Sequence, residues 1–106
     1  MDTSAFHYHL DELTSISPAR LADVNIVSAI VVAAAGAVGM TALGPPVARQ
    51  SPGGMAVALL CRDGHIVLHT IPDDGFCFVA VVARAPVDVG RAVNVISRGL
   101  ARDVGR

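Results

Sequence analysis

Apolar and polar residues alternate along residues 5–13. The apolar positions are Phe6, Tyr8 and Leu10, and the polar positions between and after them are His7, His9 and Asp11. Alternation with a period of two is typical of a strand that buries one face. We therefore expect a half-buried strand here, with its histidine face exposed to solvent or lining a cleft.

A helical pattern follows this strand. Ser17 and Pro18 are typical of an N-cap and a first helical residue. Apolar residues then recur at helical spacing on nearly every side, up to a glycine at position 36 that suits a C-cap. The pattern predicts one helix over residues 17–36 that packs on more than one side.

The second half of the chain is rich in strand-forming residues separated by turns. Residues 38–49 are interrupted by Gly-Pro-Pro, which favours an edge strand. Turn residues occupy 51–54 and 72–75, and the triplet Arg62-Asp63-Gly64 separates two further β-rich runs. The predicted strands after the first are 38–49, 57–61 with 65–71, and 76–84.

A last helix begins at Pro86, with an apolar stripe from Val89 to Val104. The elements follow the order β-α-β-β-α, with the third strand region long or doubled. This order predicts an α+β fold: a two-layer sandwich of a mainly antiparallel four-stranded sheet with two helices on one face. We expect a single domain over residues 1–106.

Composition adds expectations about partners. The chain is 53% hydrophobic, which is high for a small domain, and we expect a homodimer interface or an apolar ligand cavity to cover the excess. A net charge of −1 gives no basic surface for nucleic acid or for an anionic membrane.

The charge-free stretch from Val24 to Ala48 is long enough for a membrane span, but its glycines and the Pro45-Pro46 pair favour a buried helix that leads into a strand. The N-terminal residues Met1–Ser4 carry no basic segment of a signal peptide. We therefore expect a cytoplasmic protein without a membrane span, in which Cys61 and Cys77 stay reduced.

The four histidines are candidate site residues. His65 and His69 lie on one face of a predicted strand but about 13 Å apart, so they cannot share one metal ion without a bulge. They either line one cleft, with His69 as an acid, base or orienting group, or each makes only local contacts. His7 and His9 are about 7 Å apart, and because no second ligand cluster follows them we expect no metal site.

Arg84 closes the predicted strand 76–84, on the same face as Phe76 and Phe78. An arginine at the mouth of an apolar face suits a clamp for a carboxylate or phosphate, with the two aromatic rings beside the ligand. The alternative is that Arg84 is only the solvated end of a strand.

The run from Cys61 to Phe76 resembles the signature of bacterial S-adenosylmethionine decarboxylases. That signature has an acidic residue, Ser and His, an apolar run to His-Thr, then an aromatic residue, Pro, Glu and a Gly-aromatic pair. Upstream, Pro52 and Gly54 match the proline-glycine turn of the family, and His7 and Asp11 resemble residues of its first strand. The resemblance implies the family fold over most of the chain.

The resemblance also implies a chemical difference. In the family, the serine attacks the preceding carbonyl group, the chain is cleaved, and the serine becomes a catalytic pyruvoyl group. Gly64 occupies that position, so neither the attacking hydroxyl nor the carbon of the pyruvoyl methyl is present. The catalytic cysteine of the family falls at Arg84, and an acidic residue of its last strand falls at Ala80.

We therefore expect no pyruvoyl cofactor, and the absence of lysine excludes pyridoxal phosphate held as a Schiff base. The sequence favours a relative that is not self-processing and keeps a ligand cleft for a small molecule similar to S-adenosylmethionine or an amino acid. Such a protein would act alone, as a homodimer, or as a regulatory partner in a heteromer with an active paralogue. The alternative is a biosynthetic enzyme that uses Asp63, His65, His69 and Arg84 for acid–base chemistry without a carbonyl cofactor.

Overall fold

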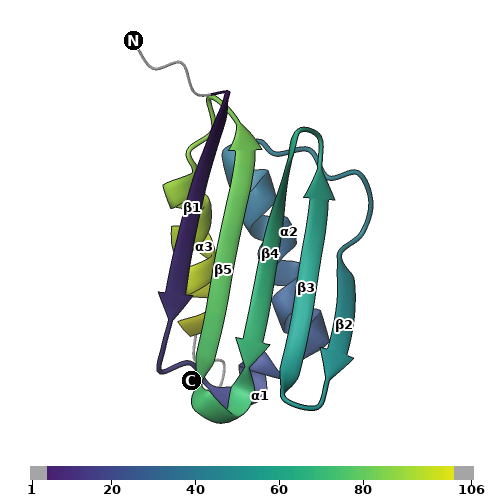
Figure 1. Ribbon diagram of the computed structural model, residues 1–106, viewed down its shortest axis with the longest axis vertical. Helices are drawn as coiled ribbons and strands as arrows, with labels where there is room; N and C mark the ends of the chain where they lie inside the picture. The colour runs from purple at the N-terminus through teal and green to yellow at the C-terminus, as the bar shows by residue number, and fades with distance from the viewer. Residues whose placement is uncertain (1–4, 102–106) are drawn as a thin grey trace.

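The computed structural model describes residues 5–101, which form one antiparallel sheet with helices on a single face (Figure 1). The sheet order is β1-β5-β4-β3-β2, and helices α2 and α3 lie side by side behind it. The elements are β1 (Phe6–Leu13), α1 (Pro18–Leu21), α2 (Val24–Val38), β2 (Val47–Ser51), β3 (Gly54–Cys61), β4 (Gly64–Ile71), the 3-10 turn η1 (Pro72–Asp74), β5 (Phe76–Arg84) and α3 (Val89–Ala101).

The predicted α+β sandwich is confirmed, but the sheet has five strands instead of four. The third strand region is doubled: β3 and β4 form a hairpin in which Cys61 pairs with Gly64. The two-residue turn between them places Asp63 in the left-handed region, at a φ of 57°. Aspartate tolerates that conformation better than most residues, so a tight turn can form at the triplet that separates the two β-rich runs.

The predicted strand over residues 38–49 is wrong in its first half. Gly39 ends α2 with a φ of 78°, and the segment that follows pairs with the sheet only through an isolated bridge between Ala42 and Cys61. The Gly44-Pro45-Pro46 segment cannot donate backbone hydrogen bonds at its prolines. Regular pairing therefore begins at Val47, and β2 is an edge strand, as the interruption indicated.

The single helix predicted over residues 17–36 is divided in two. The side chain of Ser17 accepts a hydrogen bond from the amide of Arg20 and starts α1. A second cap follows at Asp23, whose carboxylate accepts from the amides of Asn25 and Ile26 at 3.0 and 3.1 Å. A well-formed N-cap inside an apolar run starts a new helix, and α2 begins there.

The core lies between the sheet and the helices. The alternate residues of each strand that face the helices are buried, together with one side of α2 and of α3. Within the described residues, no helix is both long and apolar enough to cross a membrane. The charge-free stretch from Val24 to Ala48 instead forms α2, the following loop and the start of β2.

Helix α3 begins three residues later than predicted, at Val89, because Asp88 provides its N-terminal cap by accepting from the amide of Arg91 at 3.0 Å. Val93, Ile96 and Leu100 form the buried part of its apolar stripe. The expected end of the stripe at Val104 and residues 1–4, on which the signal-peptide expectation rested, lie outside the described residues.

Arg20 joins α1 to the end of α3. Its guanidinium donates from Nε to the carbonyl oxygen of Leu100 at 3.2 Å and from Nη2 to that of Gly99 at 2.7 Å. Carbonyl groups at the end of a helix lack partners within the helix and carry partial negative charge, so a cation is favourable there. Arg20 thus compensates the carbonyl groups that the fold buries at this end of α3.

We predict that Arg20→Met lowers the free energy of unfolding by about 1–3 kcal/mol, because two carbonyl groups lose a charged donor while the apolar stem is kept. Urea denaturation followed by circular dichroism measures the change. Arg91→Met, at an exposed position of α3, is the control and should change stability by less than about 0.5 kcal/mol. Equal effects of the two substitutions would contradict this role of Arg20.

Candidate functional site

The face of the sheet opposite the helices, here called the open face, holds most of the candidate residues. The strand register aligns side chains on it in rows, one of which runs Tyr8, Val82, His65 and Leu60. Six of the eight exposed large hydrophobic side chains among the described residues belong to this face. They are Phe6, Tyr8, Leu10, Val47, Leu60 and Ile71.

At one end of the open face, Arg84 contacts the β3–β4 turn. Its Nε lies 3.4 Å from Oδ2 of Asp63, and its Cζ lies 5.8 Å from the centre of the Phe6 ring. The backbone amide of Arg84 also donates to the carbonyl oxygen of Asp63 at 2.9 Å. The guanidinium is half exposed but already has a carboxylate partner, so Arg84 is less available as an anion clamp than the sequence suggested.

Gly64 lies beside this ion pair, where β4 pairs with Ala83 of β5. A Cβ atom added to Gly64 would clash with the carbonyl oxygen of Val82, and it would lie 3.0 Å from Cα of Ala83 and 3.3 Å from Cε of Met40. The first two neighbours are backbone atoms, which cannot move without shifting β5. The space around residue 64 therefore does not fit a serine side chain without a shift of the backbone.

The structure places the two histidines of β4 on the open face but does not bring them together. His65 is half-buried in the middle of its row, between Val82 and Leu60, whereas His69 is exposed and lies between Phe78 and Ala56. Four residues of strand separate them by about 13 Å. His65, Asp63 and Arg84 cluster near one end of the face, and His69 lies toward the other end.

A cleft of about 550 Å³ opens beside His69, at the end of the face where β2 and β3 join. It is lined by Arg49, Ala56, His69 and Ile71, together with the Gly53-Gly54 turn. We call it the Arg49–His69 cleft. Sequence reasoning missed Arg49, since only the pairing of β2 with β3 reveals that it shares a row with Ala56 and His69.

His7 lies on the other face of the sheet from the remaining candidates. It alternates with Phe6 and Tyr8, which point to the open face, and its Nδ1 lies 3.3 Å from the carbonyl oxygen of Val87. The expectation for this strand is thus reversed, because its apolar residues are exposed and its histidines face the side of the helices. The structure separates His7 from His65, His69 and Arg84.

Phe76 and Phe78 are half-buried on the open face, in rows with Ile71 and His69 respectively. Phe78 pairs directly with His69 but is not among the residues that line the Arg49–His69 cleft. Arg84 is six residues further along the same strand than Phe78, about 20 Å away by the strand rise, so one small ligand does not contact both.

The two cysteines face the core and are free thiols. Burial removes the thiolate from water, and this raises the pKa of Cys61 and raises the pKa of Cys77 to about 12. Neither thiol is thus ionised at neutral pH, which agrees with their expected role as small core residues. Within residues 5–101 no group of three or more metal-binding side chains gathers.

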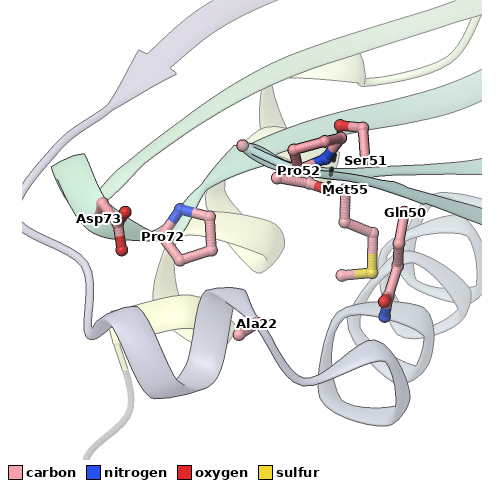
Figure 2. A pocket seen from close by; sticks show the side chains of 9 residues that line it. Ala22, Gln50, Ser51, Pro52, Met55, Pro72 and Asp73 are labelled. Carbon is pink, nitrogen blue, oxygen red and sulfur yellow. Dashed lines mark hydrogen bonds between the residues drawn. The ribbon is translucent and has the colours of Figure 1, made fainter.

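A second, smaller cavity of about 190 Å³ lies on the helix side, near the same end of the sheet (Figure 2). Gln50 and Met55 border it on one side, Pro72 and Asp73 on the other, and Ala22 of the α1–α2 junction faces it from below. Among its described lining residues only Asp73 is charged, and this residue is exposed at the surface.

Comparison with known proteins agrees with this geometry. The sequence model described as S-adenosylmethionine decarboxylase matches residues 7–104. Among solved structures, the chain is similar to the adenosylmethionine decarboxylase from Aquifex aeolicus VF5, with 22% identity and a TM-score of 0.77. The match covers 90% of this chain and 78% of that one, and it establishes a shared fold. No curated protein sequence matches the chain.

We predict that neither cysteine acts as a nucleophile in the native protein. Iodoacetamide at pH 8 should leave Cys77 unmodified, because a thiol with a pKa of about 12 forms almost no thiolate at that pH. In guanidinium chloride, where burial is lost, both cysteines should react, and intact mass spectrometry counts the additions. Rapid modification of Cys77 in the folded protein would contradict this prediction.

Proposed function

Because this chain belongs to the S-adenosylmethionine decarboxylase family and carries glycine where that chemistry needs a hydroxyl group, we propose that it is a member that does not process itself. It keeps the family fold and binds, in the Arg49–His69 cleft, a small molecule similar to S-adenosylmethionine or an amino acid. It forms no pyruvoyl group and uses no other carbonyl cofactor.

The observation that carries this proposal is the closed space at Gly64. A simple loss of the serine side chain would leave a gap that a substitution could refill. Here the carbonyl oxygen of Val82 and the backbone of Ala83 occupy the place of the missing Cβ. The ion pair of Arg84 with Asp63 lies beside Gly64, and Arg84 itself occupies the position at which the family resemblance places a cysteine. Backbone and side chains thus both support a site no longer shaped for cleavage.

The alternative of acid–base catalysis by Asp63, His65, His69 and Arg84 has less support. His69 is about 16 Å along β4 from the position of Gly64 by the strand rise, so the four side chains do not converge on one reacting group. The Asp63 carboxylate is also engaged in an ion pair with the Arg84 guanidinium. A ligand-binding role, in contrast, does not require these four side chains to converge and needs only the cleft.

We predict that Gly64→Ser remains a single uncleaved chain and lowers the free energy of unfolding by about 1–3 kcal/mol, the usual cost of overpacking. Intact mass spectrometry tests for cleavage after Asp63, and urea denaturation measures stability. Gly53→Ser is the matched control, since a Cβ there meets nothing within 4 Å. Two chains from the Gly64→Ser variant, or from the natural protein, would refute the proposal.

We further propose that the open face is a homodimer interface. Four strands about 26 Å long and the shorter β2, all about 4.8 Å apart, give a face of about 600 Å² in projection. Its accessible area is larger because side chains protrude. A standard interface removes about 800 Å² from each partner. The exposed side chains of Tyr8, Leu10 and Leu60, between 57% and 71% accessible, are the apolar centre such an interface needs.

We predict that light scattering after size exclusion gives twice the mass of one chain, and that Leu60→Glu gives the mass of one. A buried charge without a partner opposes association. Val32→Glu, at an exposed apolar position of α2 on the helix layer, is the control and should remain dimeric. A natural protein that is monomeric at 100 µM would exclude the homodimer, and assembly only after an active paralogue is added would identify a heteromer instead.

A further inference from the structure

In the Arg49–His69 cleft, Ala56 forms the floor, and Arg49 and His69 form two polar walls. Arg49 of β2 and His69 of β4 both pair with Ala56 of β3, one from each side. Adjacent strands are about 4.8 Å apart, so the two backbones stand about 10 Å from each other across a single methyl group. Long polar side chains thus flank a shallow floor in a cavity of about 550 Å³, within the usual range for small-molecule sites.

The floor stays flat because of the glycine beside it. A Cβ atom on Gly54 would clash with the carbonyl oxygen of Thr70, so β3 and β4 approach closely at this end only with glycine at residue 54. The Gly53-Gly54 turn consequently adds no side chain to the cleft and leaves its end open toward solvent.

The charges of the cleft favour an anion. None of the described residues that line it is acidic. The Arg49 guanidinium donates from Nη1 to the carbonyl oxygen of Ala48 at 2.9 Å, a contact that holds the group near the strand while its other N–H donors remain for a ligand. In the part of the chain that the structure describes, Arg49 makes no ion pair, in contrast to Arg84, which faces Asp63.

We propose that Arg49 binds the carboxylate of the ligand, with His69 on the opposite wall and the apolar part of the ligand over Ala56 and Ile71. This inference rests on the proposed function and names the group by which the cleft selects its ligand. The cleft lies about 13 Å along the strands from the Tyr8–Leu60 row, so a second copy on the open face would border the bound ligand.

Two ligand pairs that differ by a carboxylate test the proposal: S-adenosylmethionine with its decarboxylated product, and L-arginine with agmatine. Calorimetric titration of the full-length protein should give at least tenfold tighter binding of the carboxylate member of a pair. Arg49→Gln should remove that difference, and Arg49→Lys should retain part of it, since lysine keeps the charge without the planar fork. Arg62→Gln, at the exposed β3–β4 turn, is the control and should bind as the natural protein does.

The outcomes separate the two proposals. Equal binding within a pair, or a preference that survives in Arg49→Gln, overturns the carboxylate clamp and leaves the ligand cleft standing. Binding of neither pair overturns both the carboxylate clamp and the ligand cleft. The proposal that the chain is not cleaved is tested separately, by intact mass spectrometry. Loss of the preference together with loss of the native circular dichroism spectrum would be a folding effect, and Arg49→Lys then decides.

Discussion

The packing of α2 and α3 against one face of the sheet determines what the other face can do. Ile66, Leu68, Val79 and Val81 point to the helices and are fully buried, and they hold the two layers together. Every second residue of the same strands must then point to the opposite side, and these residues are also largely apolar. In a two-layer sandwich with helices on one face only, the apolar area exposed on the other face is a surface for binding. The cleft and the proposed dimer interface both lie on that face.

The approach of β4 to β5 at Gly64 links this geometry to chemistry. Sheets tolerate a side chain at every position unless two backbones come unusually close, and here the Val82 carbonyl group occupies that space. A serine with its hydroxyl aimed at the preceding carbonyl group would require these strands to separate. The glycine at this position is therefore matched to the close approach of the two backbones.

The sequence predicted the fold class and two strands well: residues 5–13 have a clear period of two, and residues 76–84 are a run of apolar and β-branched residues that ends at Arg84. It failed where local chemistry overrode the pattern, as at Asp23, whose carboxylate starts a new helix inside an apolar run, and at Gly44-Pro45-Pro46, which delays β2. The orientation of β1 was not predictable, since alternation does not say which face meets the core. Arg49 was missed for a related reason: its proximity to His69 depends on pairing across three strands, which the sequence does not contain.

The two arginines of the open face differ in their surroundings, and this difference has a consequence for evolution of the site. Arg84 is paired with Asp63 next to Gly64, so the end of the face where the family chemistry would occur is close to electrically neutral. Among the residues that the structure describes, Arg49 has no such partner, and its charge lies at the other end, beside the larger cleft. Within one chain, the binding that we propose at Arg49 thus depends on none of the atoms at residues 63, 64 or 84. The proposed absence of self-processing is therefore compatible with a retained ligand site.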